Sequence, residues 1–177
     1  GYSPCKMMNE WCLPTVVMQS YLTEIMARLE KEGVTLPHIA VTGGFTMEDQ
    51  IYKALALGAP YVKAVGVCRA SMAAAMSAKK VGELIESGNI PPELQRFGNT
   101  KEELFVDLRE LRDIYGNKAN DFSAGAIGVY SYLNRIAFGL KHFAALNRKF
   151  DIKYIEKNDI FPLTRDAKDI IDGKWMK

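Results

Sequence analysis

Apolar positions in the first half of the chain follow two periodicities in alternation. Helical spacing begins after Pro14 and stops at Gly33, which predicts a helix over residues 15–32. Two short runs, residues 38–42 and 61–67, have the β-branched content of buried strands, and each ends at a turn. Helical spacing returns between and after these runs, over residues 47–57 and 69–86. Because parallel strands need crossover helices, this order predicts a parallel α/β sheet.

The second half of the chain has a helical pattern throughout. Thr100 and Glu103 form a capping box before an apolar series that ends at Gly116, which predicts one helix across this stretch. Residues 124–146 are apolar around most of a helical circumference, which indicates a helix covered by other structure. A short helix is expected at residues 165–171. We therefore expect an α/β domain over residues 1–88 and a helical extension over residues 89–177.

Two readable strands are too few for a sheet that is covered on both faces. The chain also begins at Gly1 and not at an initiator methionine. We therefore expect further strands upstream, in a longer polypeptide.

Composition and charge exclude several classes of protein. The 23 basic and 21 acidic side chains nearly balance, which argues against a nucleic-acid surface. The long apolar stretch near residue 135 is interrupted by polar and charged side chains, so we expect no membrane span. The 3 cysteines have neither zinc nor disulfide spacing, and we expect no metal site and a reducing cytoplasm.

Glycine-rich turns follow both predicted strands. Gly43, Gly44 and Phe45 come after the first strand, and Gly66, Val67, Cys68 and Arg69 come after the second. Glycine lets backbone N–H groups approach a phosphate closely, and a helix N-terminus at the same point adds a favourable dipole. The pattern favours a phosphate site at the carboxyl edge of the sheet. An ordinary tight turn with a solvent-facing arginine is the open alternative.

The residues around these turns resemble the FMN-binding glutamate synthase family. The resemblance is carried by IAVTGGFTMED, KALALGA and YVKAV, at residues 39–49, 53–59 and 61–65. It extends over residues 1–4, 10–15 and 125–132. It implies the C-terminal half of a (β/α)8 TIM barrel, with strands seven and eight in residues 1–88, followed by the family's helical C-terminus.

The resemblance also implies a cofactor and a reaction. FMN would have its phosphate held by the backbone of Gly43, Gly44 and Phe45 on one side and of Gly66, Val67, Cys68 and Arg69 on the other. FMN would pass electrons to an imine formed from 2-oxoglutarate and ammonia, which gives glutamate. The ammonia would be free or derived from glutamine. An electron-donor protein or an NAD(P)H-linked subunit would be a partner. Catalytic residues would lie upstream of Gly1, so we expect the segment alone to be inactive. We also expect the protein to be oligomeric.

Two features limit this comparison. Cys68 stands where the family pattern has glycine, and its Cβ could crowd the phosphate. We interpret Cys68 as a small buried or half-buried hydrophobic residue, with a low-pKa nucleophile as the alternative. Residues 69–87 contain no cysteine, so we expect no iron–sulfur cluster on this segment. Two other functions stay open, namely another FMN- or phosphate-binding barrel enzyme and a non-catalytic interaction fragment.

Overall fold

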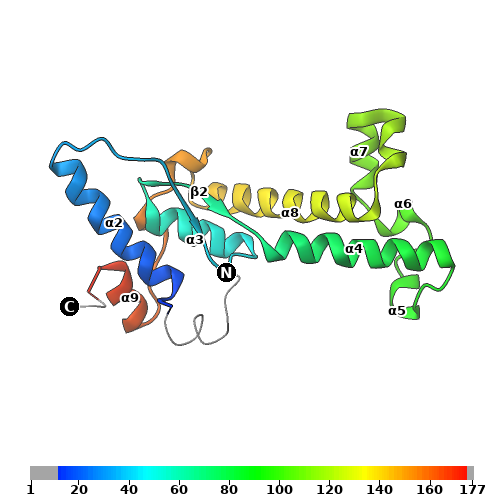
Figure 1. Cartoon of the computed structure of the whole chain (residues 1–177), viewed down its shortest axis with the longest axis horizontal. Helices are drawn as coiled ribbons and strands as arrows, with labels where there is room; N and C mark the ends of the chain where they lie inside the picture. The colour runs from blue at the N-terminus through cyan, green and yellow to red at the C-terminus, as the bar shows by residue number, and fades with distance from the viewer. Residues whose placement is uncertain (1–11, 175–177) are drawn as a thin grey trace. The chain divides into compact units, whose positions relative to one another are not determined.

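The computed structural model describes residues 12–174 of the chain, and Figure 1 shows its elements in order. The chain forms two compact units. The first combines Gly1–Val67 with Phe138–Lys177, and the second is Cys68–Ala137. This division is discontinuous in sequence and differs from the boundary at residues 88–89 that we expected.

The first unit is built around two parallel strands. The N-terminal part of this unit contains, in chain order, α2 (Thr15–Lys31), β1 (Ile39–Thr42), α3 (Glu48–Gly58) and β2 (Val62–Gly66). The end of α8 (Ala124–Leu146) is followed by η2 (Ile152–Tyr154), η3 (Lys157–Asp159) and α9 (Arg165–Ile171). The predicted helix at residues 15–32, both strands and the helices α3, α8 and α9 are therefore confirmed.

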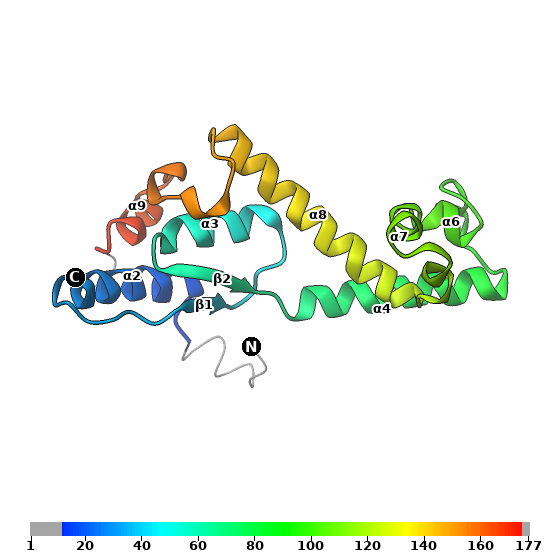
Figure 2. The same cartoon turned by 90° about the horizontal axis from the view of Figure 1, so that it is seen from above.

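The strands β1 and β2 lie side by side, and α3 is the crossover helix between them (Figure 2). The register pairs Val41 with Val65 and Thr42 with Gly66, after an irregularity near Ile39. Val41 and Val62 are buried against Ala54 of α3. Burial of apolar strand residues against a crossover helix stabilises the parallel pair, because it removes their side chains from water.

The opposite side of α3 is covered by the C-terminal part of the chain. Tyr52 and Ala56 of α3 are buried with Ala144 of α8 and with Ile155. The rings of Tyr52 and Phe143 pack with their centroids 5.5 Å apart. The helix α3 is therefore held between the sheet and the C-terminal segment.

The second unit is helical. It comprises α4 (Arg69–Ser87), α5 (Pro92–Gln95), α6 (Lys101–Leu104), α7 (Leu108–Tyr115), η1 (Gly116–Asp121) and the first part of α8. Its core contains Ala78 of α4, Phe105, Leu108, Leu111 and Ile127 of α8. Glycines on α8 allow α4 to approach closely, since a Cβ at Gly128 would lie 2.8 Å from the Ala74 carbonyl oxygen.

Two expectations about the fold are wrong. The TIM barrel is not present, because residues 12–174 contain one open sheet of two strands among many helices. Local βα alternation specifies one crossover unit, whereas a barrel requires eight such strands to close. The single helix expected from Thr100 to Gly116 is two helices, because Phe105 leaves helical geometry (φ −111°, ψ 79°) and buries its side chain.

Candidate functional site

The glycine turns after β1 and β2 lie at the same edge of the sheet. Thr42 and Gly66, the last residues of the two strands, are direct partners in the parallel register. Parallel strands end at a common edge, so the residues that follow them leave the sheet side by side. The two turns, which begin at Gly43 and at Val67, therefore start from the same edge of the sheet.

The two glycines after β1 have different local requirements. Both have positive φ angles, 134° at Gly43 and 83° at Gly44, which L-residues with a Cβ seldom adopt. A Cβ at Gly43 would overlap the Oγ1 of Thr15, at the start of α2. A Cβ at Gly44 would meet no atom of residues 12–174 within 4 Å. The first glycine therefore permits close packing, and the second faces open space.

Backbone donors at this turn are available to a ligand. Within residues 12–174, the N–H groups of Gly44 and Phe45 make no hydrogen bond to another part of the chain. Gly44 is exposed and Phe45 is half-buried. Unpaired backbone N–H groups bind either water or an acceptor on a ligand. Two consecutive donors beside open space can bind an anion such as phosphate.

The turn after β2 also depends on a missing side chain. A Cβ at Gly66 would lie 2.5 Å from the Cγ2 of Thr42 on the neighbouring strand. Val67 follows and is half-buried. Any residue larger than glycine at position 66 would therefore push the two strand ends apart, close to the predicted site.

Cys68 and Arg69 begin the second unit. Cys68 precedes α4, and its carbonyl oxygen accepts hydrogen bonds from the Ser71 hydroxyl at 2.9 Å and the Met72 N–H at 3.3 Å. Its thiol is free and exposed, so the interpretation as a buried hydrophobic residue is wrong. Arg69 is exposed at the first position of α4. Their contact with phosphate stays a prediction from the sequence.

The N-terminus of α3 does not supply the anion site that its position suggested. The Oε1 atom of Gln50 accepts the N–H groups of Thr46 at 2.9 Å and Met47 at 3.2 Å. The first turn carries Glu48 and Asp49. A hydrogen bond from Lys53, 2.8 Å away, holds the pKa of Asp49 below its ordinary value, so this carboxylate is negatively charged. The two acidic side chains offset the favourable dipole of this helix end, so α3 adds no net attraction for an anion.

The helix start of α3 also corrects a detail of the sequence analysis. Thr46 and Asp49 form a weak capping-box pattern in the sequence. In the structure Met47 precedes the helix and Gln50 supplies the side chain that caps its backbone. The glutamine three residues after Met47 was the available signal, and the threonine before it was misleading.

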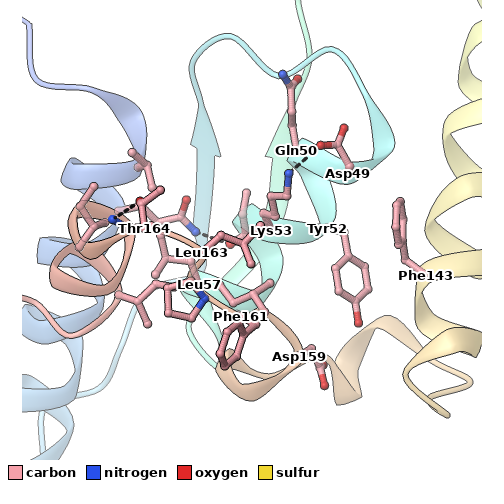
Figure 3. Close-up of a pocket in the computed structure, with 18 of the residues that line it drawn as sticks. Asp49, Gln50, Tyr52, Lys53, Leu57, Phe143, Asp159, Phe161, Leu163 and Thr164 are labelled. Carbon is pink, nitrogen blue, oxygen red and sulfur yellow. Dashed lines mark hydrogen bonds and ion pairs between the residues drawn. The ribbon is translucent and has the colours of Figure 1, made fainter.

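A cavity of about 730 Å³ lies on the side of α3 that faces the C-terminal segment (Figure 3). Its lining is mostly apolar and includes Phe45, Leu57, Phe143 and Leu163. Its polar side chains are already paired within the chain, as Asp49 with Lys53, Asn147 with the Tyr52 hydroxyl, and Thr164 with the Ala167 N–H. The cavity therefore offers apolar contact and few directed hydrogen bonds, which makes the glycine turns the better candidate.

An ion pair fixes the chain at one margin of this cavity. The Nζ of Lys149 lies 2.7 Å from the carboxylate of Asp159, and their side chains are only 16% and 8% exposed. Burial works to raise the pKa of Asp159, but hydrogen bonds from Lys149 and from the Glu156 backbone outweigh it, and the pKa is lowered. The pair therefore holds η3 against the end of α8 in the charged form.

Neither a metal cluster nor a membrane helix is found in the part of the chain that the structure describes. No group of three or more His, Cys, Asp and Glu side chains there could bind a metal ion. Over the same residues, no helix combines the length and apolar character needed to cross a bilayer.

Comparison with protein-family models, curated proteins and solved structures found no match to this chain. The likeness to the glutamate synthase family therefore rests on the chain's own motifs. Sequence reasoning missed Thr15, whose contact with Gly43 joins residues 28 positions apart. No local pattern signals such a contact, because it depends on how α2 packs beside β1.

Proposed function

We propose that the turns after β1 and β2 bind the phosphate group of FMN. The observation that supports this most directly is the pairing of Thr42 with Gly66, which places both glycine turns at one edge of the sheet. The unpaired N–H groups of Gly44 and Phe45 are suitable donors to phosphate oxygens. Among the described residues, 12–174, no atom fills the space beside Gly44, which leaves room for the group.

The identity of the ligand is a proposal from the resemblance. Among phosphate-bearing ligands, FMN is the one that the strings around residues 39–65 favour. Cys68 and Arg69 are included in the site on the same ground.

We further propose that the chain serves an FMN-dependent oxidoreductase of the glutamate synthase type. When bound, FMN supplies the redox chemistry, and the contribution of these residues is to hold and orient its phosphate. The proposed substrates are 2-oxoglutarate and glutamine or ammonia, with electrons from a donor protein or an NAD(P)H-linked subunit. We propose a cytoplasmic location and an oligomeric state on the same basis.

Titration with FMN and with riboflavin, which lacks the phosphate, tests the proposal. Flavin fluorescence and absorbance would give both dissociation constants. Because hydrogen bonds to a charged group contribute about 1.5–3 kcal/mol each, FMN should bind at least about tenfold more tightly than riboflavin. Equal affinities would contradict phosphate recognition. Binding of sugar phosphates or nucleotides in preference to FMN would support the alternative phosphate enzyme.

A further inference from the structure

The start of α2 is attached to the turn after β1 through one side chain. The Oγ1 of Thr15, the first residue of α2, donates a hydrogen bond to the carbonyl oxygen of Gly43 at 3.1 Å. The approach requires glycine at position 43, because a Cβ there would overlap the threonine hydroxyl. The turn that offers backbone N–H groups is therefore held from a distant part of the sequence.

The Thr15 hydroxyl is not used to cap its own helix. Pro14 occupies the position before α2, and its carbonyl oxygen accepts the N–H groups of Val17 at 3.0 Å and Met18 at 3.1 Å. Among residues 12–174, no side-chain hydrogen bond caps this helix end. The hydroxyl is instead turned toward Gly43, so its contact fixes the turn and not the helix start.

The planarity of the peptide unit determines what this contact does. The Gly43 carbonyl and the Gly44 N–H belong to one peptide group, and in a trans peptide these two bonds point in opposite directions. A carbonyl held on Thr15 therefore directs the Gly44 N–H away from α2. That N–H is one of the two unpaired donors described above.

We propose that Thr15 is a positioning residue for the phosphate site, which orients the Gly44 N–H by holding the Gly43 carbonyl. This inference rests on the proposed binding of the FMN phosphate by these turns. Thr15 itself does not contact the ligand in this account. Loss of its hydroxyl frees the Gly43–Gly44 peptide to rotate, and the donor then spends less time in the binding orientation.

Two substitutions separate the hydroxyl from the rest of the side chain. Thr15→Val keeps the shape and removes the donor, and Thr15→Ser keeps the donor and removes the methyl group. We expect Thr15→Val to weaken FMN binding about tenfold, the loss of one hydrogen bond to a charged group, and to leave riboflavin binding unchanged. Thr15→Ser should restore FMN affinity to within about twofold of wild type, since a hydroxyl again holds the carbonyl.

A measurement without ligand keeps this inference distinct from the proposed function. The amide nitrogen resonance of Gly44 reports the hydrogen bond at its own peptide carbonyl, so it should move in Thr15→Val and return in Thr15→Ser. Unchanged Gly44 resonance, or wild-type FMN affinity in Thr15→Val, would overturn the positioning role while the phosphate site stood. If Thr15→Val lost FMN and riboflavin affinity equally, and in proportion to a fall in its melting temperature, the role of Thr15 would be purely structural. Equal binding of both flavins by the wild type would instead remove the proposed function itself.

Discussion

Thr42 and Gly66 are paired across the two parallel strands, and the Cγ2 of Thr42 lies where a side chain at position 66 would have to fit. The threonine methyl therefore sets how closely the two strand ends approach. Because both glycine turns begin at this pair, the spacing of the candidate phosphate site depends on it.

Substitution Gly66→Ala should separate the strand ends. The added Cβ would lie 2.5 Å from the Cγ2 of Thr42, a distance that requires the backbone to shift. Overpacking of this kind costs about 1–3 kcal/mol, which denaturant unfolding measures. The double variant Thr42→Ser with Gly66→Ala removes the opposing methyl and should recover most of the loss. A double variant as unstable as the single one would show that the strain lies elsewhere.

Substitution Gly44→Ala should weaken FMN binding more than its effect on stability explains. The added methyl group would project into the open space that the phosphate is proposed to occupy. A matched control is Gly33→Ala, because Gly33 has a similar φ of 75°, against 83° at Gly44, and also has no atom of the described residues within 4 Å of its Cβ position. Both variants should lose about 1–2 kcal/mol from the left-handed conformation.

Only Gly44→Ala should lower FMN affinity, by about tenfold or more. The added methyl group would block the backbone N–H groups of the turn, and each of their hydrogen bonds would be to a charged phosphate. Isothermal titration of the two variants at equal fraction folded provides the comparison. Equal FMN affinities in the two variants would place the phosphate away from this turn.

The Lys149–Asp159 pair should make stability depend on pH at both extremes. The folded-state pKa of Asp159 is below its ordinary value of 3.8, so its contribution is present above that pH and lost as pH falls through the folded-state pKa. Burial works to lower the pKa of Lys149, but hydrogen bonds to Asp159 and Glu156 outweigh burial, and the folded-state pKa is above the ordinary value of 10.5. The contribution of Lys149 to stability is therefore present below pH 10.5 and lost as pH rises through the folded-state pKa.

Thermal melting of wild type and Asp159→Asn across this range measures the effect. The variant should melt several degrees lower near neutral pH, and the difference should shrink below pH 3.8, the ordinary pKa of the carboxyl. Glu83→Gln is the control, because its partner Lys80 is 69% exposed and surface pairs contribute little. A difference that stays constant down to strongly acidic pH would contradict the role of the ion pair.

Substitution Gly128→Ala should destabilise the second unit. Its Cβ would overlap that of Ala78 and lie 2.8 Å from the Ala74 carbonyl oxygen. The expected cost is about 1–3 kcal/mol, larger than the gain of up to about 1 kcal/mol from the better helix propensity of alanine. Pairing it with Ala78→Gly should relieve part of the cost, as seen by hydrogen exchange in α4. Unchanged protection in Gly128→Ala would contradict the close packing of α4 and α8.

The local elements could be predicted because their signals are local. The helices predicted at residues 124–146 and 165–171 have the bounds of α8 and α9. The Thr100–Glu103 capping box is confirmed, with the Glu103 N–H donating to the Thr100 hydroxyl at 3.3 Å. The break after Leu104 was missed, because Phe105 leaves the helix in order to bury its side chain in a core assembled from distant residues.

Long-range relationships were less accessible from the sequence. The two glycine turns were located from the strand pattern, and parallel pairing brings them together. The prediction of a TIM barrel was wrong, because one βα unit does not determine the number of strands in the sheet. The roles of Thr15 and Gln50 depend on how a turn packs against α2 and how α3 begins. No propensity scale describes such contacts.

The most direct test of the phosphate site is a ¹⁵N–¹H correlation spectrum of the chain titrated with FMN, with inorganic phosphate and riboflavin as comparisons. We expect FMN and phosphate to shift the amide resonances of Gly44, Phe45, Gly66 and Val67 first and in a saturable manner. Riboflavin should leave these resonances in place. Shifts confined to cavity residues such as Lys53 and Thr164, or unchanged turn resonances at saturating FMN, would contradict the proposal that the glycine turns bind phosphate.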